Sequence, residues 1–321
     1  MVSTSPTIWA KTSKAIAPDV VRTLLVLLGP TAVGKTELSL LLAEHYGCPV
    51  ISADSRQFYA GLSIGTAAPT PAELARVPHH CVGFLPLDAA YSAGLFEADV
   101  LRLLADCTTE PLAILCGGSM LYIDAVCQGI DDMPLPDPVI RSRLYDRYVS
   151  EGLSPLLDEL HRLDPLHYDE IDRYNHQRVI RALEICLSTG RPFSSFRMRT
   201  PKSRPFRIRK FGLTLPRAAL YDRINARVER MMVDGLLDEA RRLYPFRHLN
   251  ALNTLGYKEL FLYFEGRMSL PQAIDRIKSR TRRYARQQLA WFCRDPAITW
   301  LSPAVSSSLQ IVTSIQESLE R

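Results

Sequence analysis

Residues 29–36, Gly-Pro-Thr-Ala-Val-Gly-Lys-Thr, match the phosphate-loop pattern of glycine, four residues, glycine, lysine and a hydroxyl residue. In such a loop, successive backbone N–H groups and the positive end of the following helix bind a diphosphate. The lysine neutralises phosphate charge, and the hydroxyl residue binds Mg²⁺. The candidate diphosphate-binding residues are Gly29, Pro30, Thr31, Ala32, Val33, Gly34, Lys35 and Thr36, with Thr36 as the candidate Mg²⁺ ligand.

Asp54 is the acid best placed to act beside that loop. It follows the short run Val50-Ile51-Ser52, which predicts a buried strand. Strand ends in an open parallel sheet face the ligand cleft, so the Asp54 carboxylate could reach whatever the loop binds. The alternative is a turn or helix N-cap acid with a structural role.

A later apolar strand, predicted at 112–116, ends without a carboxylate. The residues there are Cys116-Gly117-Gly118-Ser119. Phosphate-loop proteins that hydrolyse ATP or GTP usually have an Asp at the end of such a strand, which helps to hold Mg²⁺. The missing carboxylate argues against an ATPase. It also argues against a small-molecule kinase, which is the alternative function for a phosphate-loop protein with a helical insertion.

The elements that must position these residues are strands alternating with helices. The pattern predicts an α/β protein, with a P-loop NTPase-like open parallel sheet core and a helical insertion domain. The predicted core strands lie at 24–28, 50–52, 112–116 and 211–215, and the predicted helices near 38–46, 95–104, 220–231 and 271–291.

The character of the chain changes after Gly129. Residues 131–138, Asp-Asp-Met-Pro-Leu-Pro-Asp-Pro, are typical of a domain junction. We therefore predict a helical insertion domain over 132–210, within a core formed by 23–131 and 211–305. Residues 1–22 are expected to form a flexible tail, with a transit peptide as the alternative, and 306–321 a C-terminal tail.

The composition is that of a folded soluble protein. Of 321 residues, 47% are apolar and 23% are charged, and the net charge is +5. The apolar run at 24–28 is far shorter than the roughly 20 residues that a membrane-spanning helix needs, so no membrane is expected as a partner. Seven cysteines without a Cys-x-x-Cys pair predict reduced thiols in the cytoplasm and argue against a structural zinc site.

Several motifs occur in an order that resembles the tRNA dimethylallyltransferase (tRNA isopentenyltransferase) family, in its bacterial type without a zinc finger. The similarity spans about residues 23–295. The motifs are the loop 29–36, Asp54-Ser55-Arg56-Gln57 with Ile64-Gly65-Thr66-Ala67, the segment 117–122, the segment 176–184, Thr254-Leu255-Gly256-Tyr257-Lys258-Glu259, and the segment 282–292.

The resemblance implies transfer of a dimethylallyl group from dimethylallyl diphosphate to the exocyclic amine of adenosine 37, immediately 3′ of the anticodon, in tRNAs. Asp54 would be the general base, because an adenine amine is a poor nucleophile until its proton is accepted. Thr31 is the second expected catalytic residue. Mg²⁺ is the expected cofactor, the tRNA anticodon stem-loop and dimethylallyl diphosphate are the expected partners, and a monomer is the expected assembly.

The same resemblance implies which residues bind diphosphate and RNA. Arg217, just after the predicted strand 211–215, matches a segment near the diphosphate. Ser119 stands where the family usually has Thr, which keeps a hydroxyl and loses a methyl group. The positions that match RNA-contacting segments are Asp54, Ser55, Arg56, Gln57, Ser119, Arg141, Gln177, Arg178, Val179, Ile180 and Arg181.

Two basic runs could contact an RNA backbone, one at 197–210 and one at 276–286. A disordered charged segment is the alternative for the first run. The runs and the insertion favour tRNA over the free nucleotides used by the related adenylate isopentenyltransferases. An RNA-binding GTP switch would need an Asn/Thr-Lys-x-Asp element, which the sequence lacks.

Overall fold

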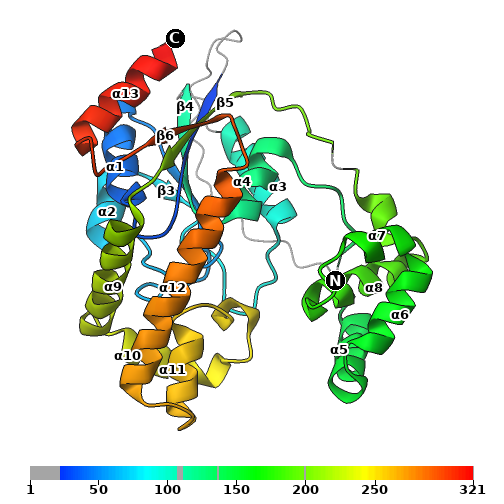
Figure 1. Ribbon diagram of the computed structural model, residues 1–321. Coiled ribbons are helices and arrows are strands. Elements are labelled where there is room, and N and C mark those ends of the chain that lie inside the picture. The colour runs from blue at the N-terminus through cyan, green and yellow to red at the C-terminus, as the bar shows by residue number, and fades with distance from the viewer. Residues whose placement is uncertain (1–21, 107–110, 136, 199, 321) are drawn as a thin grey trace. The chain divides into compact units, whose positions relative to one another are not determined.

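The computed structural model describes residues 22–320 except 107–110, 136 and 199 (Figure 1). The expected tail at 1–22 therefore lies outside the described residues, apart from Arg22. The chain divides into two compact units. Unit 1 comprises Met1–Gln128 with Ser203–Arg321, and unit 2 comprises Gly129–Lys202.

Unit 1 is built on a six-stranded parallel sheet with the order β3-β2-β4-β1-β5-β6, which confirms the predicted α/β class. The strands β2, β3 and β4, which follow β1 in the sequence, lie on one side of β1 in the sheet, and β5 and β6 lie on its other side. The strand order thus reverses beside β1, where ligands bind in such sheets. The strands are β1 (Thr23–Leu28), β2 (Val50–Ala53), β3 (His79–His80), β4 (Leu112–Gly117), β5 (Arg207–Leu213) and β6 (Ile298–Leu301).

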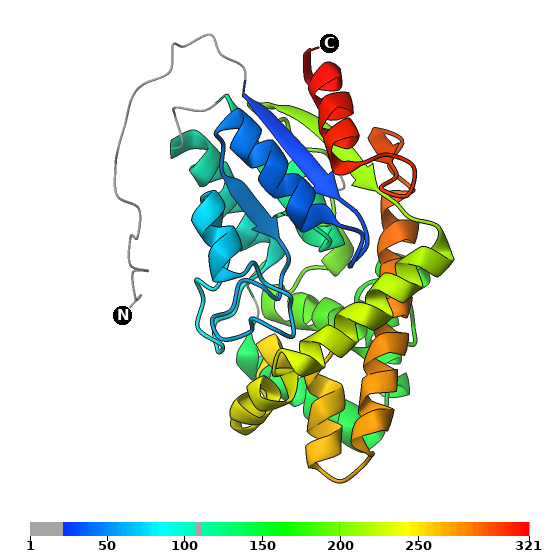
Figure 2. The same cartoon turned by 90° about the vertical axis from the view of Figure 1, so that its left-hand side faces the viewer.

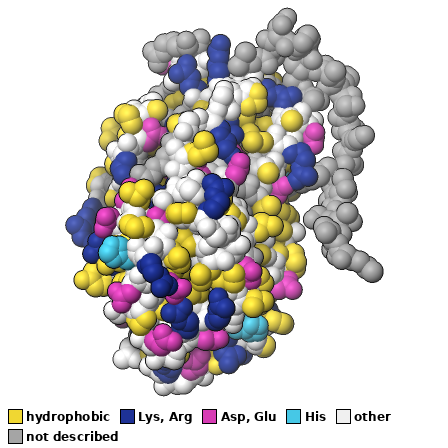
Figure 3. Space-filling view, turned by 90° about the vertical axis from the view of Figure 1, so that its right-hand side faces the viewer, with side chains coloured by type: hydrophobic (Ala, Val, Ile, Leu, Met, Phe, Trp, Pro, Cys, Tyr) yellow, Lys and Arg dark blue, Asp and Glu magenta, His cyan; other side chains and the backbone are white. Residues whose placement is uncertain are grey.

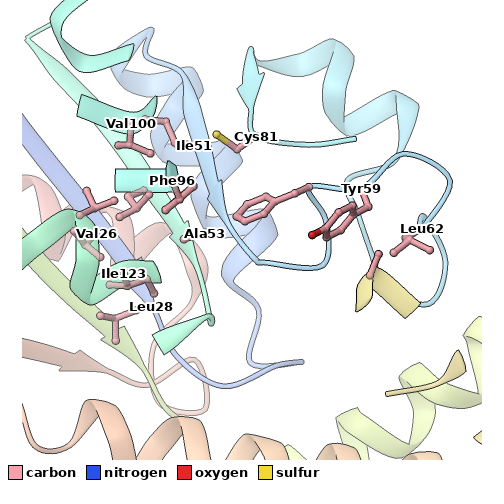
Figure 4. Close-up of a cluster of buried hydrophobic side chains, with 14 of the residues drawn as sticks. Val26, Leu28, Ile51, Ala53, Tyr59, Leu62, Cys81, Phe96, Val100 and Ile123 are labelled. Atoms are coloured by element: carbon pink, nitrogen blue, oxygen red, sulfur yellow. The ribbon is translucent and has the colours of Figure 1, made fainter. Parts of the chain in front are cut away.

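Helices cover both faces of the sheet (Figures 1 and 2). Alternate side chains of β1 pack into these two layers. Leu25 and Leu27 pack with α1 and α13, whereas Val26 packs with α3 and α4. Figure 4 shows Val26 near Phe96 of α3 and Ile123 of α4. Burial on both faces explains why β1 is apolar throughout. The helices of the two layers are α1 (Lys35–Tyr46), α13 (Ser308–Glu320), α3 (Ala93–Asp106) and α4 (Met120–Gln128).

The other helices of unit 1 mostly follow β5, and α12 packs against both α9 and α11. Arg282 of α12 donates to Asn225 Oδ1 of α9 at 2.6 Å, and Arg280 pairs with the buried Glu259 of α11 at 2.7 Å. The helices are α2 (Pro71–Arg76), α9 (Arg217–Val233), α10 (Leu236–Leu243), α11 (Tyr257–Phe264) and α12 (Leu270–Phe292), with 3₁₀ turns η2 (Tyr244–Phe246) and η3 (Asn250–Leu252).

The C-terminal segment differs from the expected tail at 306–321. It forms α13, in which Ile311, Val312 and Ile315 are buried in the cluster that contains α1. These residues recur at helical spacing, and the α1 face of the sheet offers apolar surface to cover. Strand β6, which precedes this helix, was also not predicted.

The insertion is bounded differently from the predicted 132–210. β5 begins at Arg207 and pairs with β1, so residues 203–210 belong to unit 1. Arg204 donates to Glu97 Oε1 at 2.6 Å and to Ala125 O at 2.7 Å. This buried ion pair ties the returning chain to α3 and α4, whereas the basic residues of the segment had suggested an RNA surface.

Unit 2 has a core of its own. Leu144, Leu156, Leu160, Val179 and Leu183 are fully buried in one cluster. Its elements are α5 (Pro138–Glu151), α6 (Ser154–Leu163), α7 (Pro165–Glu170), α8 (His176–Thr189) and a 3₁₀ turn η1 (Phe193–Phe196). Across both units, no described helix is long and apolar enough to cross a membrane.

Candidate active site and RNA-binding residues

The phosphate loop leaves β1 at Gly29 and enters α1 at Lys35. Gly29 has φ +144°, and a Cβ there would lie 2.6 Å from Leu213 O, so only glycine fits. Lys35 Nζ donates to Gly29 O at 2.9 Å and to Pro30 O at 2.8 Å. An ammonium has three protons, so one remains for a phosphate oxygen.

One cavity of about 260 Å³ joins this loop to the end of β2, where Asp54 lies. Gly29, Pro30 and Val33 shape the loop but do not line the cavity, and Val33 is fully buried. The lining includes Thr31, Ala32, Gly34, Lys35, Thr36, Asp54, Gln57, Cys116, Arg227, Tyr284 and Gln288.

Asp54 is half-buried in a turn that leaves part of its carboxylate free to act. Arg56 N donates to Asp54 Oδ1 at 3.0 Å, and Gln57 N donates to Asp54 O at 3.0 Å. The turn therefore engages one carboxylate oxygen, and Oδ2 can accept a proton from a ligand in the cavity. The structure thus places the predicted base and the predicted diphosphate loop at one site.

Buried cations make the cavity suitable for an anion. Burial lowers the pKa of Lys35 from 10.5 to about 8, with Arg227 acting in the same direction and Cys116 and Asp54 opposing it. Burial also lowers the pKa of Arg227, and Asp54 opposes that shift. Because each cation has lost hydration, a bound diphosphate would stabilise its charged form.

Arg227 is a site residue that sequence reasoning missed. Its Nη1 donates to Thr31 Oγ1 at 3.2 Å, and one turn earlier Arg223 Nη1 donates to Val33 O at 3.1 Å. The predicted diphosphate ligand, Arg217, instead donates to Tyr221 Oη at 3.0 Å and does not line the cavity. The basic character of α9 was visible in the sequence, but not which of its arginines faces the loop.

Thr36, the residue expected to hold Mg²⁺, lines the same cavity. Mg²⁺ usually binds through one or two protein oxygens, substrate phosphates and water. A single hydroxyl beside a diphosphate loop fits that donor set. Among the described residues, no cluster of three or more His, Cys, Asp or Glu side chains could hold a metal by itself.

Two further lining residues, Tyr284 and Gln288, come from α12 and were not predicted as site residues. Burial raises the pKa of the Tyr284 hydroxyl, and the negative charge of Asp54 adds to the shift. Both belong to the motif at 282–292. Helical spacing alone did not reveal that this face of α12 reaches the phosphate loop.

The predicted RNA-contacting residues near Asp54 are held by internal hydrogen bonds. Ser119 Oγ accepts from Ser55 N at 2.9 Å, and Arg56 Nη1 donates to Asn250 O at 2.9 Å. Gln57 Nε2 donates to Thr66 O at 3.2 Å and to Ala67 O at 3.1 Å. These contacts position the loop that carries Asp54, and RNA contact by these residues stays a prediction.

The predicted RNA-contacting residues of unit 2 divide into exposed and buried ones. Gln177 and Arg178 are exposed in the first turn of α8. Val179 and Ile180 are 0% and 4% exposed and belong to the core of the unit, so their side chains cannot present an RNA-binding surface.

The other two predicted RNA-contacting arginines of unit 2, Arg141 of α5 and Arg181 of α8, lie near the fully buried Glu184. Arg181 donates to Pro134 O at 2.6 Å and lies 3.1 Å from Glu184 Oε2. Arg141 is half-exposed and lies 3.8 Å from the same oxygen. Glu184 Oε1 also accepts from Asp137 N at 2.7 Å. Arg181 therefore has a structural role within unit 2.

Half of the described basic residues in the two predicted runs form ion pairs. Lys202 pairs with Asp132 at 3.0 Å, Lys210 with Asp295 at 2.6 Å, and Lys278 of α12 with Glu229 at 2.9 Å. On the face drawn in Figure 3, positive side chains are interspersed with acidic ones. Neither run therefore forms a purely basic surface.

Comparisons with known proteins show which family this chain resembles. The family model IPP transferase matches residues 57–295. tRNA dimethylallyltransferase 2 of Parabacteroides distasonis is 59% identical over 281 residues, which cover 87% of this chain and 94% of that relative. tRNA dimethylallyltransferase 1 of Phocaeicola vulgatus is 57% identical over 282 residues, which cover 88% and 94%.

Solved structures show the same fold. The full-length tRNA isopentenylpyrophosphate transferase of Bacillus halodurans superposes with a TM-score of 0.68 at 36% identity, covering 93% of this chain and 97% of that chain. A eukaryotic dimethylallyltransferase acting on tRNA, at 23% identity, shares the fold alone, with a TM-score of 0.74. The family model matches most of the chain, a relative that is 59% identical covers 87% of it, and one cavity holds both the phosphate loop and Asp54. The chain therefore belongs to the IPP transferase family.

Proposed function

We propose that the protein transfers a dimethylallyl group from dimethylallyl diphosphate to the exocyclic amine of adenosine 37 in tRNA, giving N6-(dimethylallyl)adenosine. The observation that carries the proposal is the single cavity lined by both the phosphate loop and Asp54. A group-transfer enzyme must hold the leaving group and the nucleophile side by side. The names of the two curated relatives described above support tRNA as the acceptor.

In the proposed reaction, the adenine nitrogen attacks the allylic carbon while the bond from that carbon to the diphosphate oxygen breaks. Asp54 accepts the proton that leaves the nitrogen. The loop N–H groups, Lys35 and Arg227 stabilise the charge that develops on the departing diphosphate. Mg²⁺, when bound at Thr36, would screen that charge further.

Thr31 has a defined place in this reaction. Its hydroxyl oxygen accepts a hydrogen bond from Arg227, so its own proton points to a different acceptor. The acceptor that gains charge as the bond breaks is the ester oxygen that joins the allylic carbon to the first phosphorus of the diphosphate. A hydrogen bond to that oxygen would strengthen in the transition state, which is what catalysis requires.

The alternatives lack comparable support. A small-molecule kinase would need a carboxylate at the end of β4, the strand beside β1, and that strand ends in Cys116 and Gly117. Transfer to free adenine nucleotides gives no role to unit 2. We propose the anticodon stem-loop as the part of tRNA that binds and a monomer as the active form. We propose the cytoplasm as the compartment, because the described cysteines are free thiols.

The test is a direct transfer assay. The protein is incubated with labelled dimethylallyl diphosphate and Mg²⁺, with unmodified tRNA in one reaction and AMP or ATP in another. We expect label in the tRNA alone, at adenosine 37. Label in AMP would identify a nucleotide enzyme, and phosphate transfer from ATP would identify a kinase.

A further inference from the structure

Gln288 of α12 connects two loops that border the cavity. Its Oε1 accepts a hydrogen bond from Thr31 N at 2.9 Å, and its Nε2 donates to Gly118 O at 2.8 Å. The partners determine the orientation of the amide, because an N–H needs an acceptor and a carbonyl needs a donor. Gln288 is 2% exposed; its bond to Gly118 O is buried and its bond to Thr31 N is partly buried.

The turn at Gly118 is shaped for this amide. A Cβ at Gly118 would lie 2.2 Å from Gln288 Nε2 and 3.3 Å from Gly29 O. The next residue, Ser119, donates from its N to Ala53 O at 3.1 Å and accepts from Ser55 N at 2.9 Å. The turn is therefore bonded to both residues that flank Asp54 in the sequence.

These contacts form a continuous connection from the diphosphate loop to the Asp54 loop. Gln288 bonds to Thr31 at one end and to the Gly118 turn at the other, and the turn holds the segment around Asp54. Because the N–H of Thr31 is used by Gln288, the cradle for phosphate oxygens must come from later N–H groups of the loop. Gln288 thus touches the site without occupying the place of the leaving group.

We propose that Gln288 is a positioning residue for the transfer reaction, an inference that rests on the function proposed above. Its amide fixes Thr31 relative to the turn that holds the Asp54 loop, and so sets the distance between the diphosphate and the attacking amine. A misplacement of about 1 Å between reacting groups can lower a rate about 10²-fold. The diphosphate contacts of Gly34, Lys35 and Thr36 do not depend on this amide.

The test compares Gln288→Met, which keeps the length of the side chain without either bond, with Gln287→Met. Gln287 is the exposed neighbour on the same helix and serves as the control. For Gln288→Met we expect kcat to fall about 10- to 100-fold. The Kd for inorganic diphosphate with Mg²⁺ should stay within about threefold, because the later part of the loop is intact. The unfolding temperature should fall, because Gln288→Met removes two hydrogen bonds at a residue that is 2% exposed, so kcat is compared at a temperature at which both variants are folded. The control should retain wild-type values.

Two outcomes of this comparison would overturn the proposal. A kcat within about twofold of wild type would show that the amide is dispensable. A diphosphate affinity that weakens in proportion to kcat would show that Gln288 only shapes the diphosphate cradle.

A double-mutant cycle gives a second measurement. Gly118→Ala must displace the Gln288 amide, so its effect on kcat should overlap with that of Gln288→Ala. The double variant should then be no more than about threefold slower than the worse single variant. Losses that multiply would contradict the proposal. Failure of the unaltered protein to label tRNA would instead contradict the proposed function, which is measured first.

Discussion

Arg227 Nη1 lies 3.2 Å from Thr31 Oγ1, although 196 residues separate the two in the sequence. Thr31 also donates its N–H to Gln288 of α12. The first half of the phosphate loop is therefore held by two helices that follow the insertion. This arrangement makes the diphosphate site dependent on residues far outside its motif.

Replacing Arg227 with alanine should slow transfer by about 10²- to 10³-fold, because it removes a buried cation and the hydrogen bond that orients the Thr31 hydroxyl. Single-turnover assays with labelled dimethylallyl diphosphate and tRNA measure this loss. Arg230→Ala is the matched control, since Arg230 is exposed on the same helix and should show wild-type rates. If the two variants slow transfer equally, Arg227 has no specific role in the reaction.

Asp54→Asn should lower turnover by about 10²-fold or more while tRNA affinity stays near wild type. The amide oxygen can still accept from Arg56 N, so the turn should keep its shape, but the side chain can no longer accept a proton. Asp88→Asn, a change at an exposed acid, is the control. If turnover falls less than tenfold, another group accepts the proton.

The affinity for inorganic diphosphate should decrease as the pH rises above about 8, the pKa to which burial lowers Lys35. Below that pH, free Lys35 is already charged, and the affinity should be nearly constant. Above it, binding requires proton uptake, because the diphosphate stabilises the ammonium, and the Kd should rise by up to about tenfold per pH unit. Calorimetry between pH 7 and pH 9.5 measures the slope.

The control for this pH dependence is Lys35→Arg, which keeps its charge throughout the range. Its affinity should be lower, since the loop is shaped for an ammonium, but nearly independent of pH. If the Kd of Lys35→Arg for diphosphate depends on pH as strongly as that of the wild type, the titrating group is not Lys35.

Arg178→Ala and Arg181→Ala should have different effects, although both residues match RNA-contacting positions. Arg178 is exposed, so Arg178→Ala should weaken tRNA binding by about 1 kcal/mol and leave the free energy of unfolding unchanged. The slope of the logarithm of the tRNA-binding constant against the logarithm of the salt concentration should become smaller by about one. Arg181→Ala leaves the buried Glu184 with the hydrogen bond from Asp137 N and the distant Arg141 as its only cation, and should lower the free energy of unfolding by about 2–4 kcal/mol. Denaturant unfolding and filter binding at several salt concentrations separate the two. Equal stability losses would contradict these separate roles.

The local motifs could be predicted from the sequence because their chemistry lies in consecutive residues. The glycines of the phosphate loop, the strand before it and the helix after it are contiguous, so residues 23–46 were enough to predict a diphosphate-binding loop. Asp54 was found for the same reason, since it directly follows a short strand whose end faces the cleft. The order of the motifs was enough to indicate the family.

The choice among similar residues was decided only by the tertiary structure. Arg217 and Arg227 lie on one helix and are chemically equivalent in the sequence, but only Arg227 lines the cavity with Thr31. Likewise Val179 is buried whereas Arg178 is exposed, and α13 is packed where a tail was expected. Periodicity specifies which residues share a face of a helix, but how that helix is rotated and what it packs against depend on contacts between segments far apart in the chain.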